Sequence, residues 1–176
     1  MKNILMSIRP QWVAKILNGE KTIEVRKRFP SDYVGWVYIY CTKNGYLHLE
    51  NNGKWSYSRN QKYTYVRTGK VVCRFWCDKV EEITTRQDRF KEFVFYETSL
   101  DMEDLLKQSC LDYNQLDNYL YGENGYAIHI TKLEIFDKPK EISEFWNNGK
   151  KVKGHNGTYQ YSKITHAPQS WQFIEV

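Results

Sequence analysis

Alternating apolar and polar positions open the chain and predict a short strand followed by a helix. Ile4, Met6 and Ile8 recur at every second position, which is the period of a strand. Pro10 then suits the first turn of a helix, and Gly19 is a natural stop because glycine adopts a left-handed conformation at little cost. An apolar stripe at helical spacing lies between them, formed by Trp12, Val13, Ile16 and Leu17.

After this helix, apolar residues again recur at every second position, and most of the remaining patterns predict strands. Predicted strands cover residues 22–26, 35–42, 70–82, 125–136 and 171–176. Capping boxes predict two short helices, one opened by Thr98 with Asp101 and one by Asp112 with Gln115, and one helical turn is expected at 141–146. Many strands with a few short helices indicate an α+β protein, and separated strands with a terminal one favour a closed, mostly antiparallel β-barrel.

Two segments stand apart from this pattern. Residues 44–69 are rich in Tyr, Trp, Asn, Lys and Gly, and turn signals at Asn44-Gly45 and Asn52-Gly53 predict inserted hairpins. Residues 147–165 are expected to form a basic loop. No repeat or Pro-rich linker divides the chain, so a single domain over residues 1–176 is the prediction.

The composition of the chain indicates which classes of protein it could belong to. Nothing approaches an apolar run long enough to cross a membrane, and the N-terminus lacks the pattern of a secretory leader, so a cytoplasmic protein without a membrane partner is expected. The four cysteines lie in apolar or strand-like contexts and predict buried, reduced thiols. Cys73 and Cys77 are about 13 Å apart on a strand, and no histidine has ligand spacing with them, so no metal or cofactor is expected. His129 is interpreted as a hydrogen-bonded structural residue.

A cluster of charges follows the first helix and is the first candidate site. Lys21, Glu24 and Arg26 occur within six positions, and Glu24 and Arg26 share one strand face about 7 Å apart. They can pair with each other in a salt bridge or flank a ligand. A lysine with a lowered pKa beside a carboxylate could also act as a general base.

The same residues carry a resemblance to a known family. Ser7-Ile8-Arg9-Pro10, the helix, and Gly19-x-Lys21-x-x-Glu24-x-Arg26 resemble the signature of ASCH domains, small β-barrel modules related to the PUA fold. The agreement continues through the predicted strands to Pro168-Gln169-Ser170-Trp171. The resemblance implies a cleft lined by Lys21, Glu24 and Arg26, and RNA or a nucleotide as its ligand. Some relatives are amidohydrolases of acetylcytidine, but this chain has Glu24 where those enzymes place a threonine.

Aromatic and basic residues interleave outside the motif. Single-stranded nucleic acid favours this mixture, because bases stack on rings while cations follow phosphates. Rings that simply cover a small barrel are the alternative. The candidate ligand contacts are Arg9, Lys21, Glu24, Arg26, Tyr40, Lys43, Trp55, Arg59, Lys150, Lys151 and Trp171.

The net charge of +5, with a pI of about 8.9, allows a polyanionic partner. A nucleic-acid-binding module for RNA is the leading hypothesis. The second is a small hydrolase acting on a modified nucleoside or on RNA, in which Lys21 is the base, Thr22 or water the nucleophile and Glu24 a further catalytic group. A protein-interaction module is the third.

Overall fold

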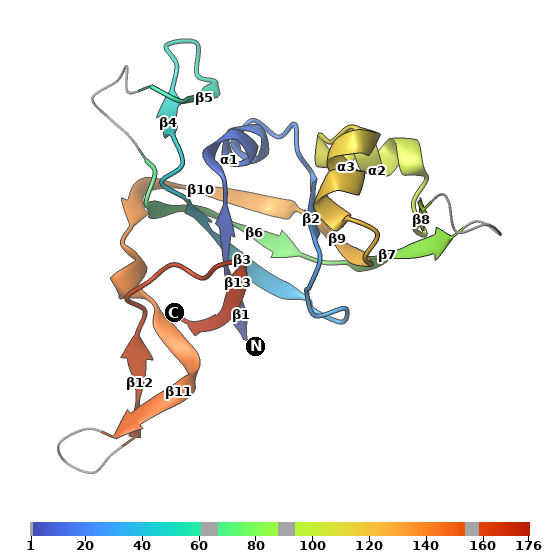
Figure 1. Cartoon of the computed structure of the whole chain (residues 1–176). Helices are drawn as coiled ribbons and strands as arrows, with labels where there is room; N and C mark the ends of the chain where they lie inside the picture. The colour runs from blue at the N-terminus through green and yellow to red at the C-terminus, as the bar shows by residue number, and fades with distance from the viewer. Residues whose placement is uncertain (1, 61–66, 88–93, 154–158) are drawn as a thin grey trace. The chain divides into compact units, whose positions relative to one another are not determined.

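The computed structural model of the chain describes residues 2–60, 67–87, 94–153 and 159–176 (Figure 1). The chain forms two compact units, each described here by itself. Unit 1 consists of residues 1–18, 35–76 and 132–176, and unit 2 of residues 19–34 and 77–131. Helices and mostly antiparallel strands are mixed, so the predicted α+β class is confirmed. None of the helices in the described ranges is both long and apolar enough to span a membrane.

Unit 1 is built on one large sheet with the strand order β10-β6-β3-β1-β13-β11-β12. The pair β1–β3 is parallel, whereas β1–β13, β11–β13 and β11–β12 are antiparallel. A separate hairpin is formed by β4 and β5. The elements are β1 (Asn3–Ile8), α1 (Pro10–Leu17), β3 (Gly35–Cys41), β4 (Tyr46–Leu49), β5 (Trp55–Ser58), β6 (Lys70–Cys77), β10 (Thr131–Lys140), the 3-10 turn η1 (Ile142–Glu144), β11 (Trp146–Lys153), β12 (Tyr159–Lys163) and β13 (Trp171–Glu175).

The first helix forms where the sequence predicts it. Pro10 occupies its first turn, and Asn18 caps its end before Gly19, whose φ of 72° needs the glycine's freedom. The Asn18 side chain accepts a 2.8 Å hydrogen bond from the Trp55 backbone N–H and donates a 2.9 Å bond to the Trp55 carbonyl oxygen. This reciprocal pair attaches the β4–β5 hairpin to the end of α1.

The core of unit 1 combines aromatic and aliphatic side chains. One cluster is formed by Leu5, Tyr38, Tyr40, Val71, Phe145, Ile164 and Ile174. Tyr38 and Phe145 meet edge to face, with ring centroids 5.3 Å apart. Tyr40 therefore lies largely inside the apolar core.

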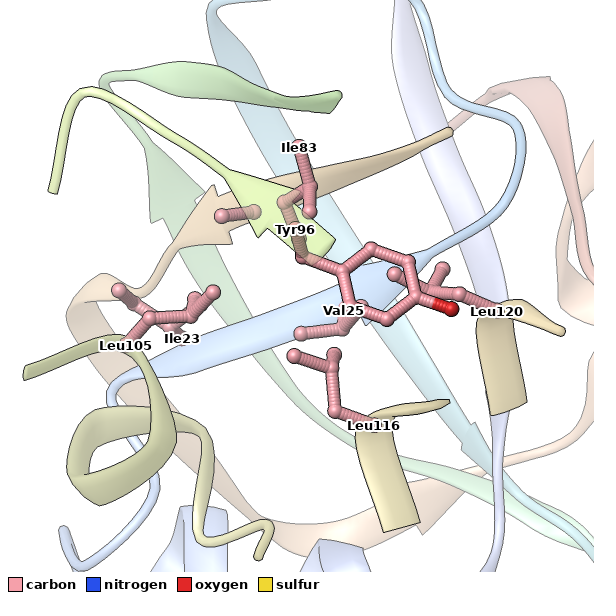
Figure 2. Close-up of a cluster of buried hydrophobic side chains, with 8 residues drawn as sticks. Ile23, Val25, Ile83, Tyr96, Leu105, Leu116 and Leu120 are labelled. Atoms are coloured by element: carbon pink, nitrogen blue, oxygen red, sulfur yellow. The ribbon is translucent and has the colours of Figure 1, made fainter. Parts of the chain in front are cut away.

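In its described residues, unit 2 is a four-stranded antiparallel sheet with two helices (Figure 1). Its strand order is β2-β9-β7-β8, so β2 is an edge strand. Figure 2 shows its core, where side chains of the strands and of both helices converge. The elements are β2 (Ile23–Arg26), β7 (Val80–Gln87), β8 (Val94–Glu97), α2 (Met102–Ser109), α3 (Tyr113–Leu120) and β9 (Gly125–His129), and the core side chains are Ile23, Val25, Ile83, Tyr96, Leu105, Leu116, Leu120 and Ala127.

Several local predictions can be compared with these elements. The capping box of Asp112 and Gln115 is present at the start of α3. The box expected from Thr98 is wrong, because Asp101 itself caps α2 by accepting a hydrogen bond from the Glu103 N–H. The one-turn helix at 141–146 is η1.

The expected basic loop at 147–165 differs most from the structure. Its backbone is largely a hairpin of β11 and β12, in which Lys151 lies opposite Tyr161 and Lys153 opposite Tyr159. The prediction failed because this hairpin has little apolar alternation and its lysines are not strand formers. Pairing with β13 places β11 in the sheet. The closed barrel and the single domain remain predictions.

Candidate functional site

Lys21 of the predicted motif lies in unit 2, at the end of a helix. Its Nζ donates a 2.6 Å hydrogen bond to the carbonyl oxygen of Ser109, the last residue of α2. The last four carbonyls of a helix lack helical partners and carry its negative dipole end, so an ammonium is favoured there. Only 3% of Lys21 is exposed, and this burial lowers its pKa, although Glu24 opposes the shift.

Glu24 connects the two cations of the motif. Its Oε2 lies 3.3 Å from the Lys21 Nζ, and its Oε1 lies 3.0 Å from the Arg26 Nε. A buried carboxylate without such partners would be costly, and the two cations compensate the burial of Glu24. The result is a largely buried cluster of two positive charges and one negative charge.

Arg26 is the most accessible member of this cluster. Its side chain is 12% exposed, against 3% for Lys21. The guanidinium also interacts with the hydroxyl of Tyr119 on α3, which the backbone of Lys27 reaches as well. Burial of that hydroxyl raises the pKa of Tyr119, while the cation opposes the shift.

Tyr119 was missed by the sequence analysis. It is 41% exposed although it is a large aromatic residue. Helical spacing alone did not single out Tyr119, because it lies three residues after Leu116, at the border of the buried face that Leu116 and Leu120 mark. A bulky, partly exposed ring beside a motif arginine is a candidate ligand contact.

The segment around Lys21 runs along the end of α2. The Thr22 N–H donates a 2.9 Å hydrogen bond to the Gln108 carbonyl oxygen, and the Cys110 thiol contacts the Glu20 carbonyl oxygen at 3.3 Å. The Thr22 hydroxyl lies 3.5 Å from the side-chain oxygen of Gln108, a long contact. Thr22 thus contacts the end of α2 through its backbone and, more loosely, through its hydroxyl.

The other predicted contacts belong to unit 1. Tyr40 is buried in the core, and Trp55 is buried beneath Arg67, whose guanidinium carbon lies 4.9 Å from the centre of the indole ring. Trp171 packs edge to face on Phe173 at 5.4 Å. Arg9, Lys43 and Arg59 are exposed, and Lys150 and Lys151 lie in β11.

A second cluster of titratable side chains occurs in unit 2. Glu81 is buried and accepts from the Ser99 hydroxyl, with its Oε1 2.7 Å from the Lys79 Nζ and 2.8 Å from the His129 Nε2. Burial alone would raise the pKa of Glu81, but these partners outweigh it and lower that pKa. The expected structural role of His129 agrees with this contact.

The cysteines are free thiols, and Cys41, Cys73 and Cys77 are buried. Burial raises the pKa of Cys77 to about 12 and that of Cys41 and Cys73 further. Within the described part of the chain, no group of three or more His, Cys, Asp or Glu side chains could hold a metal ion.

Comparisons with known proteins give a likeness of fold. No protein-family model matches the chain, and no curated protein matches its sequence significantly. The crystal structure of ASCH from Zymomonas mobilis matches with a TM-score of 0.57 and 16% identity, covering 99% of this chain and 88% of that one.

Two variants of that protein match in the same way. A tyrosine-to-phenylalanine variant has a TM-score of 0.57 and 15% identity, covering 99% of this chain and 91% of that one. A serine-to-alanine variant has a TM-score of 0.55 and 16% identity, covering 99% and 89%. The resemblance seen in the sequence is therefore confirmed at the level of the fold, and the chain has the fold of the ASCH domains.

Proposed function

We propose that this chain is an RNA-binding module whose motif site in unit 2 contacts a base or nucleotide. The observation that carries the proposal is the Glu24-centred cluster, in which two cations share one carboxylate and Arg26 meets an exposed tyrosine. The ASCH fold supports it as well, since nucleic-acid binding is what the resemblance implies.

We expect the motif residues to have different tasks. Lys21 is buried against the end of α2, so its task is to hold Glu24 and the helix end in place. Glu24 in turn orients Arg26. Arg26 and Tyr119 are the members that a ligand would touch, because an arginine fork reads carbonyl or phosphate oxygens and a tyrosine ring stacks on a base.

Fluorescence anisotropy tests this division of tasks. Labelled single-stranded RNA, duplex RNA and single-stranded DNA are titrated at about 50 mM and about 200 mM salt, a range in which phosphate contacts lose much of their affinity. Tyr119→Leu is expected to weaken single-stranded RNA binding by about tenfold, the scale of one lost stacking contact.

Lys27→Gln is the control, because it changes only the side chain of a neighbouring, partly exposed cation, which pairs with Glu123 and not with the cluster. It is expected to reduce the salt slope by no more than about 0.7, the value of one phosphate contact on a single strand. Equal losses for both variants would contradict a site centred on Arg26 and Tyr119. No binding to any polymer would refute the function.

A hydrolase acting on a modified nucleoside or on RNA is the second candidate. The observation in its favour is the lowered pKa of Lys21, which makes the amine a better general base. On an acylated nucleoside, water would attack the acyl carbon while Lys21 accepts its proton, and Lys21 would pass that proton to the amine nitrogen as the C–N bond breaks, releasing the carboxylic acid and the nucleoside. If Thr22 attacks instead, the acyl group stays on Thr22 as an ester until water hydrolyses it. Turnover of such a nucleoside, abolished by Lys21→Gln, would favour this candidate over binding alone.

The remaining expectations accompany the proposed function. We infer a mostly antiparallel, PUA-like barrel, a single domain over residues 1–176, and a cytoplasmic place of action without a cofactor.

A further inference from the structure

The charges of the chain divide unequally between the two units. Unit 1 contains 17 lysines and arginines and 6 acids, a formal net charge of +11. Unit 2 contains 9 basic and 15 acidic residues, a net charge of −6, and together they give the +5 of the chain. A polyanion is therefore attracted to unit 1 and repelled by most of unit 2, although the motif lies in unit 2.

Unit 1 also presents aromatic rings and cations together on β3, β6 and β10. These three strands are neighbours at one end of its sheet, where β10 is the edge (Figure 1). Trp36 of β3 and Trp76 of β6 meet edge to face, with centroids 5.4 Å apart and an interplanar angle of 81°. Both indoles are only partly buried, which leaves ring surface at the outside of the sheet.

Cations lie over these rings. The Arg74 guanidinium carbon is 4.1 Å from the centre of the Trp36 ring, and the Lys132 Nζ is 5.7 Å from that of Trp76. Further along β10, the Lys140 Nζ is 5.6 Å from the centre of the Phe136 ring. We call Trp36, Arg74, Trp76, Lys132, Phe136 and Lys140 the sheet-end patch.

The patch is held in place by contacts that leave it accessible. Arg74 donates a 2.9 Å hydrogen bond from Nη1 to the Tyr38 hydroxyl and a 2.7 Å bond from Nε to Glu134. Its side chain is nevertheless 30% exposed, and the Lys140 side chain is 40% exposed. Tyr38 belongs to the core, so Arg74 is oriented by a rigid partner rather than free to move away.

We infer that the sheet-end patch binds a single strand of RNA, with bases on Trp76 and Arg74 and phosphates at Lys132 and Lys140. Aromatic rings and arginine planes are the surfaces on which unpaired bases stack, and lysines follow the backbone. The net charge of unit 1 complements the strand. This inference goes beyond the proposed function and rests on it, because the patch would bind the class of ligand that the proposed function assigns to the chain.

The test uses the full chain and a labelled, short oligouridylate in anisotropy titrations. Trp76→Leu is expected to weaken binding by about tenfold, as for one lost stacking contact. Lys132→Gln is expected to lower the salt slope by about 0.7. Arg74→Gln is compared with Arg86→Gln, because each removes a guanidinium paired with a glutamate, one in unit 1 and the other in unit 2. Unfolding midpoints verify that each variant is folded.

The outcomes separate this inference from the proposed function. Loss with Trp76→Leu and Arg74→Gln, but not with Arg86→Gln, supports the sheet-end patch. If the patch variants bind RNA as tightly as the parent chain while Tyr119→Leu binds more weakly, RNA binding at the patch is refuted and the proposed function is supported. If Arg74→Gln and Arg86→Gln weaken binding equally, the effect is that of positive charge in general, and a specific site at the patch is also refuted. A parent chain that binds no RNA refutes both.

Discussion

The Nζ of Lys21 donates a 2.6 Å hydrogen bond to the carbonyl oxygen of Ser109, so the lysine of the motif closes the end of α2. The same ammonium lies 3.3 Å from Glu24. A residue expected at the mouth of a cleft is thus a buried link between a helix and an edge strand. Under the proposed function, a ligand contacts Arg26 of the motif and Tyr119 of α3.

Replacement of Lys21 is expected to destabilise the fold. Lys21→Met leaves the Ser109 carbonyl without this donor and Glu24 with one cation fewer. Breaking a buried ion pair from one side typically costs about 3–5 kcal/mol, and the remaining Arg26 contact favours the lower end. Urea unfolding followed by circular dichroism measures the change.

Lys27→Met is the control for this substitution. Lys27 pairs with Glu123 at 3.5 Å, but both side chains are substantially exposed. Such surface pairs contribute about 0–1 kcal/mol. Similar losses for Lys21→Met and Lys27→Met would contradict the structural role of Lys21.

The Glu81 cluster predicts how stability depends on acid. Because Lys79, Ser99 and His129 lower the pKa of Glu81 below the ordinary value of a glutamate, the folded chain keeps this carboxylate charged at pH values at which an unfolded chain would protonate it. The stabilisation is complete above the unfolded pKa and is lost as the pH falls through the folded one. Glu81→Gln should therefore flatten the fall of the unfolding free energy below about pH 5. If the unfolding free energy of Glu81→Gln falls with acid as steeply as that of the parent chain, these contacts do not persist in solution.

The thiols predict a pattern of chemical labelling. Cys110 is only partly buried, whereas the other three cysteines are buried and have raised pKa values. Since the thiolate is the reactive form, iodoacetamide at neutral pH should label Cys110 first in the native chain and all four cysteines in urea. Mass spectrometry of the peptides distinguishes the sites. Native labelling of Cys73 as fast as that of Cys110 would contradict the burial.

The capping box of α3 gives a prediction for local stability. The Asp112 side chain accepts a 2.8 Å hydrogen bond from the Gln115 N–H, so Asp112→Ala should cost about 1 kcal/mol of unfolding free energy. Asn118→Ala, an exposed change inside the same helix, should not destabilise the chain, because alanine is the better helix former. An equally large loss of unfolding free energy for Asn118→Ala would show that the effect of Asp112→Ala does not come from the lost cap.

The sequence predicted those helix ends that are determined by a few neighbouring residues. Pro10 and Gly19 bounded the first helix, and Asp112 with Gln115 opened α3, because caps are satisfied within one turn. The hairpin of β11 and β12 escaped prediction because its sequence lacks the apolar alternation of a strand, although its two strands pair locally.

The site was predictable only in part. Spacing along one strand foretold that Glu24 and Arg26 could pair. This spacing could not predict the contacts with Ser109 and Tyr119, because these residues lie in two helices that pack beside the strand in unit 2. The sheet-end patch likewise depends on strand order, because Trp36, Trp76 and Lys132 come from three separate stretches of the chain.

Photo-cross-linking to a short RNA that contains 4-thiouridine tests the central claim most directly. After digestion, mass spectrometry identifies the peptides that carry nucleotide adducts. The proposed function predicts adducts on the peptide that contains Tyr119, reduced by unlabelled RNA in excess and absent from a heat-unfolded sample. Adducts confined to peptides without Arg26 or Tyr119, or no adducts that unlabelled RNA displaces, would contradict it.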